Sequence, residues 1–172
     1  GYQQGESLSL QNLSFEDEFA NWNRFANSDK SSVVDPTKED SPFNPIHGTK
    51  VYKSTNGSGC LDRGVTLEEN TYYKLTYYRY GGKEKNQSAE VMLTSHSYDQ
   101  APFPYSDKTW KPVLFTETPM GDGWVKCVKI YPPKIVADDN GNPFNYKLAV
   151  RGWGADSMTV YLDNISVTKF DT

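Results

Sequence analysis

The stretch VYLDNISVTKF, residues 160–170, has the alternation of a half-buried β-strand but loses its phase in the middle. Up to Leu162 the apolar residues share one side of the strand, whereas from Ile165 onward they have the opposite parity. A slip of one residue would turn the apolar face to solvent. An inserted residue, a β-bulge, restores the inward face. The pattern therefore predicts a bulged strand with a carboxylate, Asp163, at the irregularity.

The segment SLSLQNLSFEDEF, residues 7–19, shows the same phase slip near the other end of the chain. The apolar residues up to Leu10 share one parity and those from Leu13 onward share the other, so the slip falls at Gln11-Asn12. Three acidic residues follow closely. The same argument predicts a second bulged strand here, so that each terminus has an irregular strand with acid beside it.

Composition limits the class of protein. The chain has 172 residues, with 18 basic and 22 acidic side chains and a formal net charge of −4. This length suits one domain, expected over residues 1–172 with its core from about 8 to 170. The absence of a basic block argues against nucleic acid or an anionic membrane as partner. No apolar run is long enough for a membrane span. We expect a monomer that is secreted, periplasmic or on the cell surface, with its signal peptide removed.

The chain between the termini reads as all-β. In TYYKLTYYRY, residues 71–80, Tyr73, Leu75 and Tyr77 lie on one side, and Tyr78 and Tyr80 lie on the other. Further strands are expected within 47–54, 60–67, 88–95, 123–133 and 144–154, separated by Gly- and Asn-rich turns, with long loops at 27–48 and 97–112. Many short strands with such turns predict a β-sandwich jelly roll of two antiparallel sheets.

Five motifs occur in an order that is known from a family. They are NLSFEDEFANW (12–22), HGTKVYKS (47–54), VTLEENTYYKLTYY (65–78), GDGWVKCVKIY (121–131) and MTVYLDNISV (158–167). In this order the chain resembles the galactose-binding-like jelly-roll modules grouped as carbohydrate-binding module families four, nine and twenty-two. The resemblance covers residues 12–167 and implies a module that binds glycans without catalysis.

The resemblance also implies a structural calcium where the terminal strands meet. In such modules the ion is held by one acid near each terminus and by backbone carbonyls. Carried over by motif, these acids are Glu16 and Asp163, and the carbonyl of Lys50 is a further candidate. Calcium prefers oxygen ligands, and irregular backbone frees carbonyls to supply them. The alternative is that both carboxylates are solvated or accept hydrogen bonds from loop amides.

This chain departs from the family pattern in three places. Tyr77-Tyr78 stands where the family has Phe-Trp, and the loop at 101–110 has no counterpart. In the strand that begins at Trp124, Cys127 has one parity and Val128 the other, so its inward face is left open. The glycan that is bound therefore need not be that of the named families.

The sequence is rich in aromatic residues, at 14%. Sugar rings present apolar CH faces that stack on aromatic side chains, while their hydroxyls bind amides, carboxylates and guanidinium groups. The candidate ligand-binding residues are Tyr78, Tyr80, Glu90, Tyr105, Trp110 and Arg151. Glu90 is expected beside the strand tyrosines if the strands within 71–80 and 88–95 pair as a simple hairpin, and the two candidates from the 97–112 loop are expected to overhang the ligand face. For the strand tyrosines, packing against a covering loop is an equal alternative. The leading hypothesis is non-catalytic binding of an extracellular polysaccharide or oligosaccharide.

Other functions remain possible on this fold. A cell-surface adhesin or protein-interaction domain is the main alternative, because fold does not fix function. A small glycan-active hydrolase is less favoured. A retaining glycosidase needs two carboxyls about 5 Å apart, and the acids at 16–18 lie at a phase slip without a second acidic cluster. Cys60 and Cys127 are expected to be buried thiols, with a disulfide as the alternative.

Overall fold

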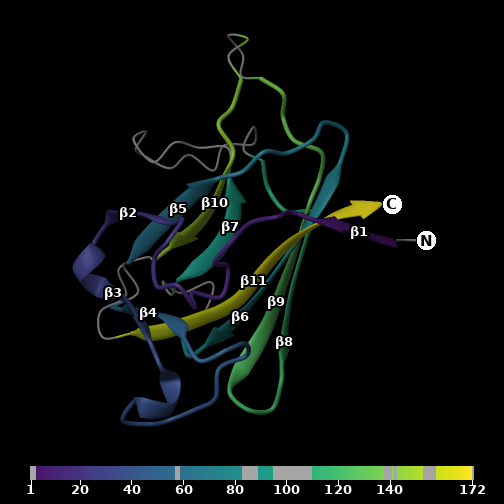
Figure 1. The fold of residues 1–172 in the computed structure, drawn as a ribbon. Coiled ribbons are helices and arrows are strands. Elements are labelled where there is room, and N and C mark those ends of the chain that lie inside the picture. Colours follow the sequence, from purple (N-terminus) through teal and green to yellow (C-terminus); the bar gives the residue numbers. More distant parts are fainter. Residues whose placement is uncertain are drawn as a thin grey trace.

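The computed structural model describes residues 3–56, 59–82, 89–94, 110–137, 141, 143–152 and 158–171. Two antiparallel sheets pack face to face (Figure 1). The larger has the order β3-β4-β11-β6-β9-β8, with β1 also paired to β11, and the smaller has the order β2-β5-β10-β7. The strands are β1 (Gln3–Ser7), β2 (Asn23–Ala26), β3 (Ser31–Val34), β4 (Val51–Thr55), β5 (Cys60–Gly64), β6 (Tyr72–Tyr80), β7 (Glu90–Thr94), β8 (Leu114–Pro119), β9 (Trp124–Tyr131), β10 (Lys147–Arg151) and β11 (Thr159–Asp171). The predicted all-β sandwich is confirmed.

The C-terminal bulge lies where the sequence predicts it. β11 pairs with β6 on one side, and the register shifts between Asp163 and Ser166. Asn164, inside the shift, has a positive φ of 51°, a conformation that asparagine tolerates better than most residues. The bulge keeps Leu162 and Val167 buried although their parities differ.

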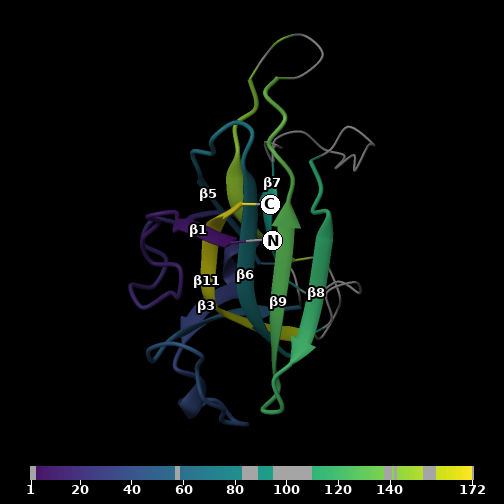
Figure 2. The same cartoon turned by 90° about the vertical axis from the view of Figure 1, so that its right-hand side faces the viewer.

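The N-terminal segment differs from the prediction. The terminal strand is β1, whose irregularity lies between Gln4 and Ser7, and it pairs with β11 so that the two termini lie close together (Figure 2). The predicted bulged strand around Gln11-Asn12 is wrong, because this segment is a loop. Asn12 has a positive φ and organises the loop: its amide donates to the carbonyl of Ala20 at 2.7 Å. Local side-chain hydrogen bonds of this kind compete with strand pairing.

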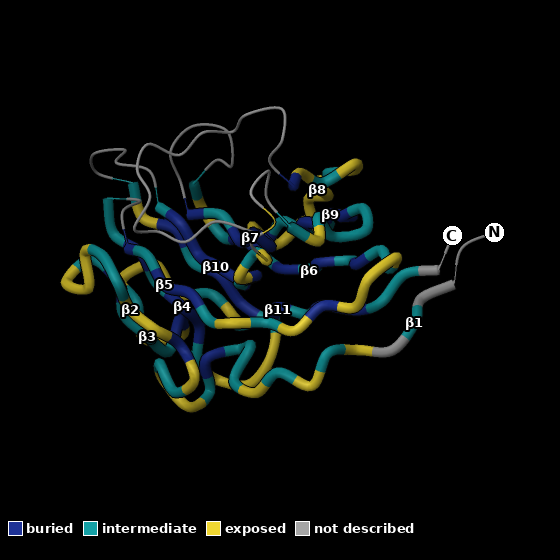
Figure 3. Tube along the Cα trace, turned by 90° about the horizontal axis from the view of Figure 1, so that it is seen from above, coloured by how far each residue is buried: buried dark blue, intermediate teal, exposed yellow. Residues whose placement is uncertain are grey.

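The core lies between the two sheets and follows the predicted parities of β6, where Tyr73, Leu75 and Tyr77 are at most 1% exposed (Figure 3). On β9 the structure settles the open question: Cys127 and Lys129 face inward. Both cysteines are free thiols, Cys127 in the larger sheet and Cys60 in the smaller one. Cys127 is buried as expected, whereas the expectation that Cys60 is buried is wrong, because it is only partly buried at the start of β5.

Two features of the pairing decide where a ligand can bind. First, β6 and β7 follow each other in the chain but belong to different sheets, so they do not form a simple hairpin. Second, the predicted long loop at 27–48 contains β3 and two 3-10 helices, Ser28–Lys30 and Pro36–Lys38. In the described part of the chain, no helix is long and apolar enough to cross a membrane.

Candidate functional site

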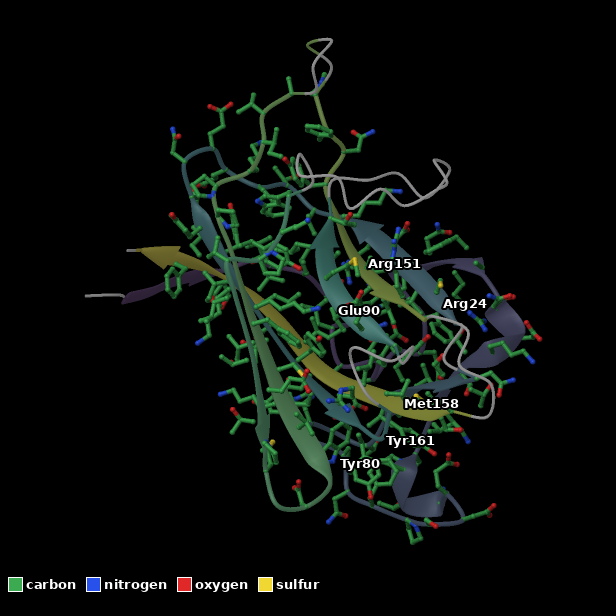
Figure 4. The ribbon with its side chains drawn as sticks, turned by 180° about the vertical axis from the view of Figure 1, so that it is seen from behind. Arg24, Tyr80, Glu90, Arg151, Met158 and Tyr161 are labelled. Atoms are coloured by element: carbon green, nitrogen blue, oxygen red, sulfur yellow. The ribbon has the colours of Figure 1, made fainter. Side chains whose placement is uncertain are left out.

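The sequence-predicted ligand residues do not form one face. Tyr78 and Tyr80 lie on the outer face of the seven-stranded sheet, whereas Glu90 and Arg151 are cross-strand neighbours on the outer face of the four-stranded sheet. In Figure 4, Tyr80 lies beside Tyr161 and away from Glu90 and Arg151. The expected neighbourhood of Tyr80 and Glu90 depended on a β6–β7 hairpin, and it is wrong for that reason.

Tyr80 is used for packing. Phe43 stacks on its ring, with centroids 3.8 Å apart and planes 2° apart. Gly123, at a φ of 95°, lies so close that a Cβ there would be 2.4 Å from the Tyr80 ring. Trp124 packs edge-on against both rings and donates its indole N–H to the carbonyl of Asn44 at 2.8 Å. The covering-loop alternative therefore describes Tyr80, because Phe43 covers one face of its ring.

A shallow pocket of about 340 Å³ remains beside this aromatic cluster. Tyr161 donates its hydroxyl hydrogen to Glu39 at 2.7 Å, and Lys53 forms an ion pair with the same carboxylate. The hydrogen bond from Lys53, followed by that from Tyr161, lowers the pKa of Glu39. Burial and the hydrogen bond to Glu39 raise the pKa of Tyr161. This group of side chains fastens the 35–47 loop to the sheet.

Trp110 belongs to the core. It is 5% exposed, packs against Tyr131 and Tyr146, and donates its indole N–H to the carbonyl of Pro132 at 2.8 Å. The expectation that it overhangs a ligand face is therefore wrong. Tyr105, the other predicted loop aromatic, lies outside the described residues.

Glu90 and Arg151 face each other across β7 and β10. Arg151 is 3% exposed. The ammonium of Lys129 lies 3.4 Å from the Glu90 carboxylate and donates to the carbonyl of Val91 at 2.7 Å. Lys129 thus bonds the backbone of β7, the last strand of the smaller sheet, and joins the two sheets there.

A polar cluster that sequence reasoning did not single out lies on the outer face of the four-stranded sheet. Asp62 on β5 is 3% exposed and accepts a hydrogen bond from the Asn23 amide at 3.2 Å. The ammonium of Lys147 on β10 lies 3.4 Å from the other Asp62 oxygen. Asn23 is exposed and Lys147 partly so, so the cluster presents two donors around one buried carboxylate. In the sequence, the cluster could have been found from the polar residues that alternate with apolar ones in CLDRG (60–64) and YKLAVRG (146–152).

An open pocket of about 500 Å³ adjoins this cluster and includes Lys147. The residues that line it are Gly64, Val65, Thr66, Leu67, Lys134, Phe144, Asn145, Tyr146 and Lys147. Among the described residues, Gly64 has no heavy atom within 4 Å of where a Cβ would be, so the described part of the chain leaves the pocket open at that point. Phe144 packs edge-on against Tyr146, whose pKa burial raises to about 12. The pocket combines an aromatic wall with polar groups, as small-molecule sites do.

The two acids predicted to bind calcium converge on one loop. Asp163 is fully buried, and one of its oxygens accepts backbone N–H bonds from Ile46 and His47, both at 2.9 Å. Burial, opposed by these amides and reinforced by the charge of Glu16, raises the pKa of Asp163 to about 6. Glu16 accepts a hydrogen bond from the Thr49 backbone at 2.7 Å.

These residues fit a calcium site in part. Asp163 is buried and Glu16 is partly exposed, and the charge of Glu16 acts on Asp163. Like charges near each other favour a cation, and carboxylate oxygens suit calcium. The described residues contain no cluster of three or more His, Cys, Asp or Glu side chains that could hold a metal. Backbone carbonyls would have to complete the coordination. Lys50 lies in this loop; its backbone nitrogen is 3.4 Å from Glu16, and its ammonium pairs with Glu18.

Comparison with known proteins shows the fold and no sequence family. No family model and no curated protein matches the chain. Among solved structures, a family 16 carbohydrate-binding module is 17% identical, with a TM-score of 0.57 over 91% of this chain and 96% of that one. TmCBM61, in complex with beta-1,4-galactotriose, is 15% identical, with a TM-score of 0.52 over 92% and 95% of the two chains.

Enzymes share the same fold. A cyclase from Fischerella sp. TAU is 12% identical, with a TM-score of 0.60 over 98% of both chains. The fold is therefore that of carbohydrate-binding modules and equally that of these cyclases. Because fold does not fix function, the choice between binding and catalysis depends on the side chains.

Proposed function

We propose that this chain is a non-catalytic module that binds a polysaccharide or oligosaccharide at the end of its four-stranded sheet where β5 ends and β10 begins. The bound glycan occupies the 500 Å³ pocket and extends over the cluster of Asn23, Asp62 and Lys147. The module acts as a monomer outside the cytoplasm, where polysaccharides are exposed.

The observation that carries the proposal is this polar cluster beside an aromatic-walled pocket. Asp62 holds both donors in place with its own carboxylate, so Asn23 and Lys147 are oriented before a ligand arrives. Sugar hydroxyls both donate and accept hydrogen bonds, and they suit paired amide, ammonium and carboxylate groups. Preorganised side chains lose less conformational entropy on binding.

The arrangement of the acids supports binding rather than hydrolysis. Asp62 lies level with Ala149 and Met92, while Glu90 is two residues further along β7. Two strand spacings and two residues of rise place the Cα atoms of Asp62 and Glu90 about 12 Å apart along the sheet. This exceeds both the separation of about 5 Å in retaining glycosidases and the range of about 6.5–9.5 Å in inverting ones.

A structural calcium at Glu16 and Asp163 belongs to the same proposal. The ion would join the 46–50 loop to the bulge of β11, with carboxylate oxygens and loop carbonyls as its ligands. Its role would be to stabilise the fold, because Asp163 belongs to the larger sheet and the polar cluster lies on the smaller one.

Affinity electrophoresis in gels that contain soluble glucans, xylans, galactans, mannans and pectins tests the proposal. We expect retardation by at least one polysaccharide. Lys147→Gln should weaken that binding by about 5- to 30-fold, since one or two kcal/mol are lost with the contact. Lys126→Gln, a strand lysine on the larger sheet, is the matched control and should bind normally.

Two results would contradict the proposal. If no polysaccharide in the panel retards the protein, glycan binding is not its function. If Lys147→Gln and Asn23→Ala bind the identified glycan as the native chain does, the site lies elsewhere. Thermal unfolding of each variant separates lost contact from lost fold, because both side chains are at least partly exposed.

A further inference from the structure

The described residues that line the pocket beside Lys147 carry positive charge and no negative charge. Among its lining residues are two lysines, Lys134 and Lys147, and no carboxylate. The ammonium of Lys147 forms an ion pair with the carboxylate of Asp62, 3.4 Å away. In the described part of the chain Lys134 has no ion-pair partner; its ammonium lies 5.9 Å from the centroid of the Tyr146 ring.

The positive charge of this pocket contrasts with the whole chain, which has a formal net charge of −4. A general attraction for anions would need a basic surface, which the sequence lacks. A single unpaired ammonium at the rim of an aromatic pocket instead favours a ligand that brings one carboxylate per sugar ring.

We infer that the pocket selects a glycan that contains uronic-acid residues. The sugar carboxylate pairs with the ammonium of Lys134, the apolar face of the ring packs on Phe144, and hydroxyls reach Lys147 and Asn145. The inference rests on the proposed glycan binding and adds the class of glycan. All four side chains line the same pocket, whose volume of about 500 Å³ suits one or two sugar rings.

The test compares acidic oligosaccharides with their own carboxyl-reduced forms. Oligogalacturonate, oligoglucuronate and oligomannuronate are titrated into the full chain by calorimetry beside the reduced sugars, which keep the linkage and lose only the charge. We expect at least one acidic form to bind about tenfold more tightly than its reduced form, as for one charge-assisted contact. Raising the ionic strength should weaken the acidic form alone.

Two variants assign the preference to this pocket. Lys134→Gln should abolish the preference and leave the affinity for the reduced form unchanged. Lys38→Gln, an exposed lysine beside the pocket on the larger sheet, removes the same charge elsewhere and should keep the preference. Because neither lysine is buried, both variants should fold, and the thermal midpoint verifies this.

The outcomes separate this inference from the proposed function. Equal affinity for acidic and reduced forms, or binding of neutral glycans only, overturns the inference and leaves glycan binding intact. An equal loss in Lys134→Gln and Lys38→Gln also overturns it, because the preference would then follow net charge. Failure of every glycan to bind overturns both.

Discussion

Asp163 should make the protein less stable as the pH rises from about 4 to about 6. Its carboxyl is fully buried, and burial raises its pKa from 3.8 to about 6 in the folded state. A raised carboxyl pKa means that the folded state binds the proton more tightly than the unfolded state does. Stability is therefore highest below the ordinary carboxyl range and is lost as the pH passes through the window up to about 6.

The magnitude follows from the difference between 3.8 and about 6. Each factor of ten in proton affinity corresponds to 1.36 kcal/mol, so ionised Asp163 costs about 3 kcal/mol of unfolding free energy. The carboxyls of Asp35 and Glu39 act in the opposite sense, because hydrogen bonds from Thr37 and Lys53 lower their pKa values. The pH dependence of the native chain's stability is thus the sum of these opposing contributions, and a variant is needed to isolate that of Asp163.

Urea unfolding at several pH values in the presence of a chelator, for the native chain and for Asp163→Asn, gives the isolated contribution. The variant cannot ionise at this position, so the native-minus-variant difference should fall by about 2.4 kcal/mol between pH 4 and pH 7, because part of the cost is already present at pH 4. Adding calcium should restore stability at pH 7 and much less at pH 4, because the metal binds the ionised pair; saturation at a hundredfold over Kd adds about 2.7 kcal/mol.

Two results would refute this reasoning. A difference curve that is flat or that rises across the window means that the amides of Ile46 and His47 outweigh burial at Asp163. A calcium effect that is absent at pH 7, or that survives in Asp163→Asn, removes this carboxylate from any metal site.

Three further predictions concern the predicted site residues and the cysteines. Trp110→Phe should lower the unfolding free energy by about 1–3 kcal/mol, since it leaves the carbonyl of Pro132 without its donor. Glycan retention should not change. Lost retention with normal stability would show that Trp110 binds the ligand. Tyr80→Ala should likewise lower the thermal unfolding midpoint and leave glycan retention unchanged, because Phe43 covers its ring. Melting and retention are measured on the same variant. Mass spectrometry of the unreduced, denatured chain should find both Cys60 and Cys127 alkylated; protection of both would show a disulfide.

The sequence predicts the strands well because a half-buried strand has a two-residue period. The inward residues of β6 follow directly from that alternation, and so does the bulge at Asp163, because a phase slip has few other physical explanations. The same slip at Gln11-Asn12 has a different cause. Asn12 bonds the backbone of a loop, and the apolar pattern alone cannot distinguish a loop that packs on the core from a bulged strand.

The candidate site was less predictable because it depends on which strands share a sheet. Periodicity places Tyr80 and Glu90 on outward faces but does not show that β6 and β7 belong to different sheets. Burial of Trp110 depends on Tyr131 and Tyr146, which are distant in sequence. The cluster at Asp62 likewise needs β5 beside β10, a pairing between strands far apart in the chain.

The aromatic residues of the sequence predicted a ligand-binding face on what is the larger sheet. In the structure, several of those rings instead hold a loop against the sheet. Phe43 covers Tyr80, Trp124 bonds the carbonyl of Asn44, and Asp163 bonds the amides of Ile46 and His47. These contacts occupy one end of the outer face of the larger sheet with the chain's own residues. The smaller sheet instead keeps an accessible amide and an accessible ammonium around a buried carboxylate. Because a binding face must present hydrogen-bonding groups to solvent, the smaller sheet is the better candidate, and its charge rather than its aromatic content indicates the ligand.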